Sequence, residues 1–99
     1  MPNRLSDADI DASLQALNGR AGQSWSLVDG KLTRTFRFAD FSAALGFMVR
    51  SGLVAEQLNH HPEWSNVYAT VDVALVTHDA DGLTELDFRL ANAMEDIAG

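Results

Sequence analysis

Residues 64–78 read WSNVYATVDVALVTH, and this run of strand-forming residues determines the architecture that we expect. Val71, Val73 and Leu75 lie on one face of the extended chain, and Asp72 and Ala74 lie on the other. This alternation is typical of a half-buried strand. The pattern predicts a short strand near 63–68 and a longer strand near 70–77.

An earlier segment, residues 25–38, reads WSLVDGKLTRTFRF and predicts a β-hairpin. Asp29-Gly30 favours a two-residue type I′ turn, in which both central residues have positive φ. Such a turn places Leu27 opposite Leu32.

The second strand of this hairpin carries one charge on an otherwise apolar face. The same register places Trp25 opposite Arg34, so we expect Arg34 near the rim of the sheet, beside Trp25. This face comprises Leu32, Arg34, Phe36 and Phe38, and the opposite face comprises Thr33, Thr35 and Arg37.

Helical patterns flank the two predicted strand pairs. Ser6 is the expected cap of a first helix that stops at Asn18-Gly19. Thr84 is the expected cap of a final helix, with Asp87 three residues on. The apolar stripe of the first helix is Ile10, Leu14 and Leu17, and that of the final helix is Leu86, Leu90, Ala93, Met94 and Ile97.

A longer helix is predicted between the strand pairs, from Asp40 to about Leu58. Pro62 cannot continue a helix and biases the residue before it toward extended backbone, so the helix ends just before or within the His60-His61 pair. Its predicted apolar face comprises Phe41, Ala44, Leu45, Met48, Gly52 and Ala55, widened by Phe47, Val54 and Leu58. Small residues on this helix permit close approach of a sheet or another subunit.

The order of elements is therefore α-β-β-α-β-β-α. We predict an α+β fold in which three helices pack on one face of a single four-stranded antiparallel sheet. The 99 residues are enough for one domain, spanning 1–99.

Composition excludes several classes of function. The formal charge of −7, with scattered basic residues, argues against a nucleic-acid surface. The absence of cysteine excludes thiolate chemistry and disulfides. No stretch has the character of a signal peptide or a membrane span, so the expected location is the cytoplasm. A domain of this size also gains stability from self-association.

All three histidines, His60, His61 and His78, fall within one nineteen-residue window. Imidazole both gives and takes protons near neutral pH, so a proton-transfer site is one interpretation. A metal site is another, since Glu56 lies one helical turn before His60. Adjacent histidines in extended chain point to opposite faces, however, which is awkward for one ion. A third interpretation is that each histidine is simply a surface or structural residue.

The remaining candidates have structural interpretations of comparable weight. Trp25, Trp64 and Tyr68 could stack on a flat ligand, although core packing is the better interpretation of each. By itself, Asp87 is better explained as a helix-start residue than as a catalytic acid. The simplest interpretation of the other acidic residues of this region is that they are solvated surface charges: Asp72, Asp79, Asp81 and Glu85.

The histidine segment closely resembles the pterin-4a-carbinolamine dehydratase family, which in animals is also known as the dimerisation cofactor of a homeodomain transcription factor. The resemblance covers about residues 20–98 and centres on EQLNHHPEWSNVY, residues 56–68. It extends to Trp25, Phe36-x-Phe38-x-Asp40-Phe41, Gly46-Phe47-Met48, Val71-x-Val73, Thr77-His78 and Gly82-Leu83-Thr84-x-x-Asp87.

What the resemblance implies is dehydration of 4a-hydroxytetrahydropterin to quinonoid dihydropterin and water. It implies no metal and no redox cofactor, assembly as a homodimer or homotetramer, and a functional link to an aromatic amino acid hydroxylase. Its catalytic residues correspond to His60, His61 and His78. Its substrate-binding residues correspond to Glu56, Asn59, Val76, Thr77, Asp79, Trp25 and Asp87.

The sequence departs from the family at Leu86, where many members have arginine. Leucine supplies neither the charge nor the donors of a guanidinium, and Arg89 and Arg34 are the candidates to replace it. Asn59 stands where some relatives have aspartate. The alternative to an enzyme is a dehydratase-like binding or assembly module.

Overall fold

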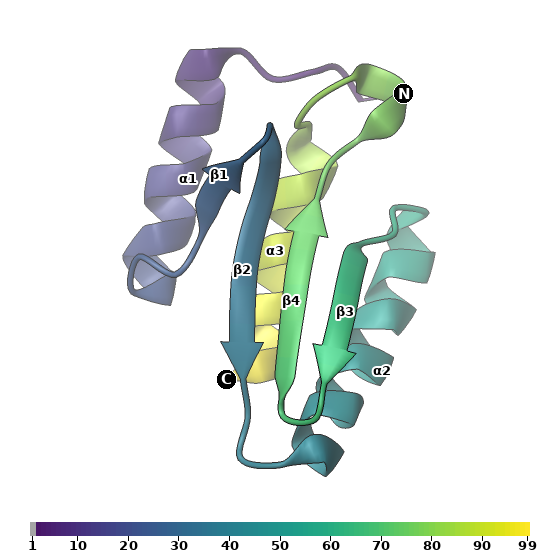
Figure 1. Cartoon of the computed structure of the whole chain (residues 1–99). Coiled ribbons are helices and arrows are strands. Elements are labelled where there is room, and N and C mark those ends of the chain that lie inside the picture. Colours follow the sequence, from purple (N-terminus) through teal and green to yellow (C-terminus); the bar gives the residue numbers. More distant parts are fainter. Residues whose placement is uncertain (1) are drawn as a thin grey trace.

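Four strands form one antiparallel sheet in the spatial order β1-β2-β4-β3, in a computed structural model that describes residues 2–99 (Figure 1). The strands are β1 (Ser26–Val28), β2 (Lys31–Arg37), β3 (Glu63–Val67) and β4 (Thr70–Leu75). Both hairpins and the central β2–β4 pair are antiparallel. The predicted sheet is confirmed.

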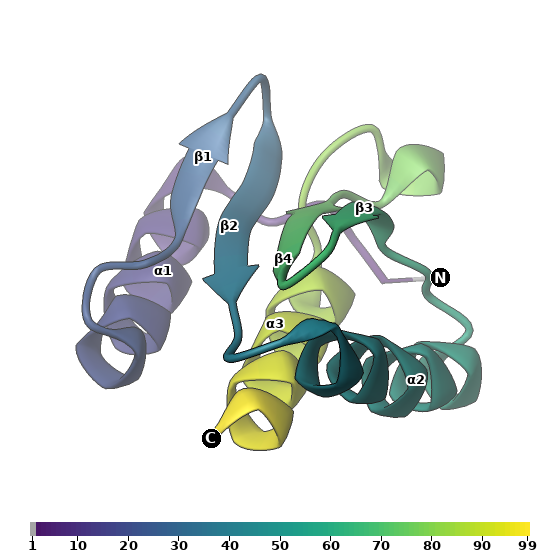
Figure 2. The ribbon, with the colours of Figure 1, turned by 60° about the horizontal axis from the view of Figure 1, so that its bottom comes forward.

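Three helices, α1 (Asp7–Ala21), α2 (Phe41–Leu58) and α3 (Glu85–Ala98), lie on one side of the sheet (Figure 2). α3 lies between α1 and α2 and contacts both. The predicted α-β-β-α-β-β-α order and the α+β class are therefore confirmed. No helix of residues 2–99 covers the other face of the sheet.

The core lies between the sheet and the helices. Phe36 stacks on Phe38, and Phe47 of α2 lies against both rings. Each large side chain that is fully buried here contributes about 1.5–3 kcal/mol relative to an exposed one. The fully buried apolar side chains include Leu17, Leu32, Phe36, Phe47, Val71, Leu75, Leu90 and Met94.

The β1–β2 hairpin has the predicted turn and register. Asp29 and Gly30 have φ of 52° and 76°, and Leu27 pairs with Leu32. The ladder stops at Ser26, so Trp25 lies just outside β1. Trp25 and Arg34 nevertheless converge, because both donate hydrogen bonds to the Glu95 carboxylate.

Helix α1 is longer than predicted. It continues past Asn18-Gly19 to Ala21 and is capped by Gly22 in the left-handed conformation, at φ 63°. Asn18 faces the core instead of ending the helix, and its side chain bonds the backbone N–H and C=O of Trp25, at 2.9 Å each. This tertiary contact explains why the sequence signal for termination was misleading.

Helix α2 has the predicted ends, but its buried face is rotated from the predicted one. Asp40 is the N-cap, and its side chain accepts a hydrogen bond from the N–H of Ala43 at 2.8 Å. The buried residues of α2 are Ala44, Phe47, Ser51 and Ala55. The predicted core residues Phe41 and Leu45 are instead exposed, on a stripe that comprises Phe41, Leu45, Val49 and Leu53.

Strand β4 ends at Leu75, two residues earlier than predicted, and the loop after it contains a 3₁₀ turn, η1 (His78–Ala80). Thr77 and Gly82 close this loop through an isolated β-bridge. The amino-terminal segment supports it, since the Leu5 N–H donates to the Leu83 carbonyl at 2.8 Å. Within residues 2–99, no helix is both long and apolar enough to cross a membrane.

Candidate active site

The end of α2 directs His60 into the protein. Asn59 caps the helix in the left-handed conformation at φ 51°, and the His60 N–H returns to the Ala55 carbonyl at 3.0 Å. Asparagine tolerates this conformation better than most residues, which gives Asn59 a structural role here. The His60 ring is 8% exposed, and its Nε2 lies 2.6 Å from Oδ1 of Asp87.

Asp87 is fully buried and connects His60 to the first turn of α3. Its Oδ2 accepts hydrogen bonds from the Thr77 hydroxyl at 2.8 Å and from the Thr84 N–H at 2.9 Å. The Thr77 hydroxyl lies 2.8 Å from the Thr84 hydroxyl, which therefore donates to it. Thr84 and Asp87 also form the predicted capping box.

This buried network brings the two histidine segments together. Thr77 immediately precedes His78, and His60 immediately precedes His61. A single carboxylate, that of Asp87, bonds both Thr77 and His60. The convergence of two segments far apart in the sequence therefore rests on the first turn of α3.

His61 points away from the core, unlike its neighbour. Its side chain is 58% exposed, and Nε2 lies 2.7 Å from Oε1 of Glu56 in the last turns of α2. The second carboxylate oxygen of Glu56 has no hydrogen-bond partner among residues 2–99. His61 and this oxygen are both accessible to a ligand.

His78 is the most exposed of the three rings, at 74%, and lies at the start of η1. Its Nε2 lies 2.7 Å from Oε2 of Glu63, and Oε1 of Glu63 accepts a hydrogen bond from Lys31 at 2.6 Å. The hydrogen bond from Lys31, followed by that from His78, lowers the pKa of Glu63 below its ordinary value.

All three histidines thus share one arrangement, a carboxylate at Nε2. Where the carboxylate is ionised it only accepts hydrogen bonds, and the ring paired with it then donates from Nε2 and keeps Nδ1 for other partners. Among residues 2–99, no protein group bonds Nδ1 of any of these rings. The pairs are His60–Asp87, His61–Glu56 and His78–Glu63.

The arrangement is unsuited to a metal ion. His60 faces inward and His61 faces outward, and each imidazole bonds its own carboxylate. In the described part of the chain, no three side chains of the ligating types are grouped to hold an ion. The chemistry that this geometry allows is proton transfer by imidazoles with fixed orientation.

Two predicted site residues are not available to a ligand. Trp25 is 2% exposed, and its Nε1 donates a hydrogen bond to Glu95 at 2.9 Å. At a helical rise of about 1.5 Å per residue, Glu95 lies about 12 Å along α3 from Asp87. Asp87 is fully buried. Trp25 is therefore a core residue of this chain, and Asp87 contacts the histidines through its hydrogen bond with His60.

The other predicted residues lie around the histidines. Asn59 and Asp79 are exposed, Val76 is half-buried, and Thr77 is buried in the Asp87 network. The sequence analysis assigned no role to Glu63, which lies within the histidine motif and contacts Nε2 of His78 in the structure.

Neither Arg34 nor Arg89 supplies the positive charge that is missing at Leu86. Arg34 pairs with Glu95 near the other end of α3. Arg89 is exposed and lines a hollow between α1 and α3. Leu86 itself is half-buried beside Asp87 and contributes no polar side-chain group.

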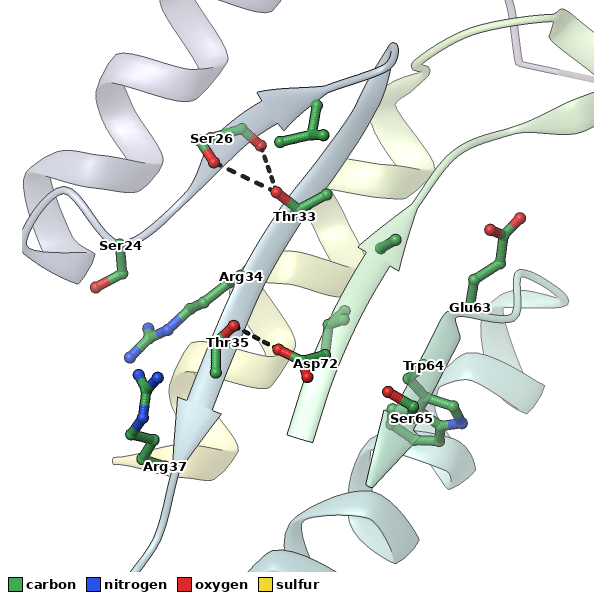
Figure 3. Close-up of a pocket in the computed structure, with 13 residues that line it drawn as sticks. Ser24, Ser26, Thr33, Arg34, Thr35, Arg37, Glu63, Trp64, Ser65 and Asp72 are labelled. Atoms are coloured by element: carbon green, nitrogen blue, oxygen red, sulfur yellow. Dashed lines mark hydrogen bonds between the residues drawn. The ribbon is translucent and has the colours of Figure 1, made fainter. Parts of the chain in front are cut away.

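A shallow hollow of about 730 Å³ lies on the helix-free face of the sheet (Figure 3). Its lining is largely polar and includes Thr35 and Asp72, which hydrogen-bond each other. No histidine lines it, and it reaches the histidine region only at Glu63. We place the candidate site at the histidines because the ionisable groups that can move protons are there.

Comparisons with known proteins identify the family. The family model described as "Pterin 4 alpha carbinolamine dehydratase" matches residues 3–97. Proteins of Brucella ovis and Brucella suis named "Putative pterin-4-alpha-carbinolamine dehydratase" are each 50% identical over 99 residues, covering 98% of this chain and 97% of theirs. The chain belongs to the pterin-4a-carbinolamine dehydratase family.

A solved structure agrees with this assignment. A Brucella melitensis protein described as a transcriptional coactivator/pterin dehydratase superposes with a TM-score of 0.89. It is 48% identical, and the match covers 98% of this chain and all of that one. The resemblance that the histidine motif indicated is therefore confirmed over nearly the whole length.

Proposed function

We propose that this protein catalyses the dehydration of 4a-hydroxytetrahydropterins, giving quinonoid dihydropterin and water. The observation that carries the proposal is the set of three histidines, each bonded to its own carboxylate, in a member of this family. The substrate class follows from the family.

The reaction requires two proton transfers. The C4a–O bond breaks as an acid protonates the leaving hydroxyl, N5 loses its proton to a base, and a C4a=N5 double bond forms. A protonated imidazole is the acid and a neutral imidazole is the base. The oxidation level does not change, so the reaction needs no redox cofactor.

Exposure separates the roles of the histidines in this proposal. His61 and His78 are accessible and exchange protons with the pterin, in an order that depends on which face carries the hydroxyl. His60, held by buried Asp87, borders the site and supports its electrostatics. His61 and His78 thus supply the acid/base pair.

Binding of the pterin is assigned to groups next to these rings. The free oxygen of Glu56 accepts hydrogen bonds from the amino-pyrimidinone edge of the pterin, whose N–H groups are donors. Asn59 and Asp79 provide exposed polar groups, and Val76 provides an apolar surface beside them. Thr77 contributes indirectly, through Asp87.

The proposal is tested by following the absorbance of chemically generated 4a-hydroxytetrahydropterin with and without the protein. We expect the protein to accelerate dehydration well above the spontaneous rate, and to retain the activity after treatment with a chelator. A rate equal to the spontaneous one would refute the enzyme assignment. It would favour the second candidate, a binding or assembly module, which is motivated by the relative from Brucella melitensis that is described as a transcriptional coactivator.

We also propose that the protein is a homo-oligomer that pairs through α2. The exposed stripe of Phe41, Leu45, Val49 and Leu53 repeats every four residues, and these side chains are 44–63% exposed. The stripe carries no charge, and two copies related by a two-fold axis would cover each other's stripe. A second copy of the chain is therefore the partner that it fits.

Leu45→Glu is expected to convert the oligomer to monomers, because the contact would bury a charge in an apolar interface. Sedimentation velocity measures the change. Gln15→Glu is the control, since it adds the same charge to an exposed helix position but lies on α1, outside the stripe. A wild-type protein that sediments as a monomer would contradict the proposed assembly.

The cytoplasmic location and the functional link to a pterin-dependent hydroxylase remain part of the proposal. The link follows from chemistry, because a 4a-hydroxytetrahydropterin arises when a hydroxylase transfers one oxygen atom to its substrate and leaves the other on the pterin.

A further inference from the structure

Glu63 connects two parts of the sheet to His78. It is the first residue of β3, at the edge of the sheet (Figure 3), and its Cα partner in β4 is Ala74. Lys31 begins β2, on the other side of β4, so its side chain reaches across β4 to meet the Glu63 carboxylate.

Each oxygen of the Glu63 carboxylate has one partner. Oε1 receives Lys31 and Oε2 receives Nε2 of His78, at 2.6 and 2.7 Å. Lys31 thus fixes one end of the carboxylate while the other end holds the imidazole. The ring of His78, otherwise exposed on a loop, acquires a defined orientation.

The charge of Glu63 determines which ring nitrogen is available. Lys31 and His78 lower the pKa of this carboxyl, which favours the ionised form at neutral pH. An ionised carboxylate cannot donate, so Nε2 of His78 carries a hydrogen. In the neutral ring, Nδ1 is then the proton acceptor.

We infer that Glu63 is a positioning residue that fixes the His78 ring in its Nε2–H tautomer and presents Nδ1 to the substrate. The inference rests on the proposed function for the use of that nitrogen, but the tautomer itself is independent of it. The other charged groups of the region are Lys31, Asp79 and Asp81 on the loop of His78, and Arg4, whose guanidinium donates to the Asp81 carbonyl at 3.3 Å.

An ordinary surface ion pair is the competing explanation, and stability does not discriminate between the two. Exposed pairs of this kind contribute little, and Lys31 and Glu63 are 36% and 44% exposed. The tautomer of His78 is the discriminating measurement, because an incidental contact would not determine it.

The test is ¹⁵N NMR of histidine-labelled protein, which distinguishes the two neutral tautomers. We expect His78 to be in the Nε2–H form in the wild type and to become a mixture in Glu63→Ala. Asp11→Asn, which removes one exposed carboxylate from α1, should change nothing. A His78 tautomer unchanged in Glu63→Ala would overturn the inference.

Kinetics give the second readout. In Glu63→Ala we expect kcat to fall about tenfold with little change in KM. This loss is smaller than the rate enhancement of about 10²–10⁴-fold that general acid–base catalysis contributes, because the imidazole itself remains. An unchanged kcat would show that the orientation is not used. If the wild type proved inactive while the tautomer still depended on Glu63, the proposed function alone would fail.

The pH dependence of stability reports on the same carboxylate. Because the pKa of Glu63 is lowered in the folded protein, this carboxylate stabilises the fold at pH values above its pKa in the unfolded chain, about 4.3. The stabilisation is lost as the pH falls through the lower pKa of the folded protein. Glu63→Gln should therefore lower Tm only slightly near neutral pH, as expected for an exposed pair, and have no effect in strong acid. Lys31→Met should raise the pKa of Glu63, measured by ¹³C NMR. An unchanged pKa would refute the role of Lys31.

Discussion

Replacing His61 with alanine is expected to lower the dehydration rate about 100-fold or more, the contribution typical of a general acid or base. The ring is exposed and makes its one polar contact with Glu56 on the surface, so its loss removes no core packing. The fold should therefore survive, as judged by circular dichroism and Tm, while kcat falls.

Gln57→Ala is the matched control for this variant. Gln57 is exposed in the last turn of α2, close to Glu56 in the chain, and makes no side-chain hydrogen bond within residues 2–99. Its loss should leave the rate unchanged. If His61→Ala retained full activity, His61 would have no part in the proton transfers, and His78 with His60 would have to supply both.

Replacing Asp87 with asparagine is expected to destabilise the protein by about 3 kcal/mol, because it disrupts the hydrogen bonds of a fully buried carboxyl group. The substitution keeps the shape but exchanges one acceptor oxygen for an NH₂ group. Either the His60 ring or the donors Thr77 and Thr84 would then face another donor in a fully buried site. For a domain of this size we expect Tm to fall by roughly 15 °C.

Activity should also fall in Asp87→Asn at temperatures where the protein remains folded, because His60 and the strand leading to His78 lose their common anchor. Glu85→Gln is the control, since Glu85 lies in the same turn of α3 but is exposed. A loss of stability no larger than that of Glu85→Gln would show that the buried network is not a structural anchor.

Local signals predicted most of the secondary structure. The Asp29-Gly30 turn requires positive φ at both positions, and that requirement fixes the hairpin register without tertiary information. The caps Ser6, Asp40 and Thr84 are equally local, since each side chain bonds backbone within its own first turn.

The predictions from the sequence were wrong where contacts between residues distant in the chain determine the structure. Asn18-Gly19 is a sequence pattern typical of a helix C-terminus, but the Asn18 side chain hydrogen-bonds the Trp25 backbone and the helix continues. On α2, apolar residues cover more than one face, so periodicity alone could not show which face meets the sheet. The structure buries Phe47 and leaves Leu45 exposed.

The sequence by itself determined the order of elements, the family and the three histidines, because motifs, caps and alternation are properties of short segments. The tertiary structure alone decided the carboxylate partner of His60 and that of His78. These pairs are separated by 27 and 15 residues, and they depend on how α3 packs beside α2 and how β3 aligns with β4. Tertiary packing makes His60 a buried, anchored ring and leaves His61, its neighbour, free to meet a ligand.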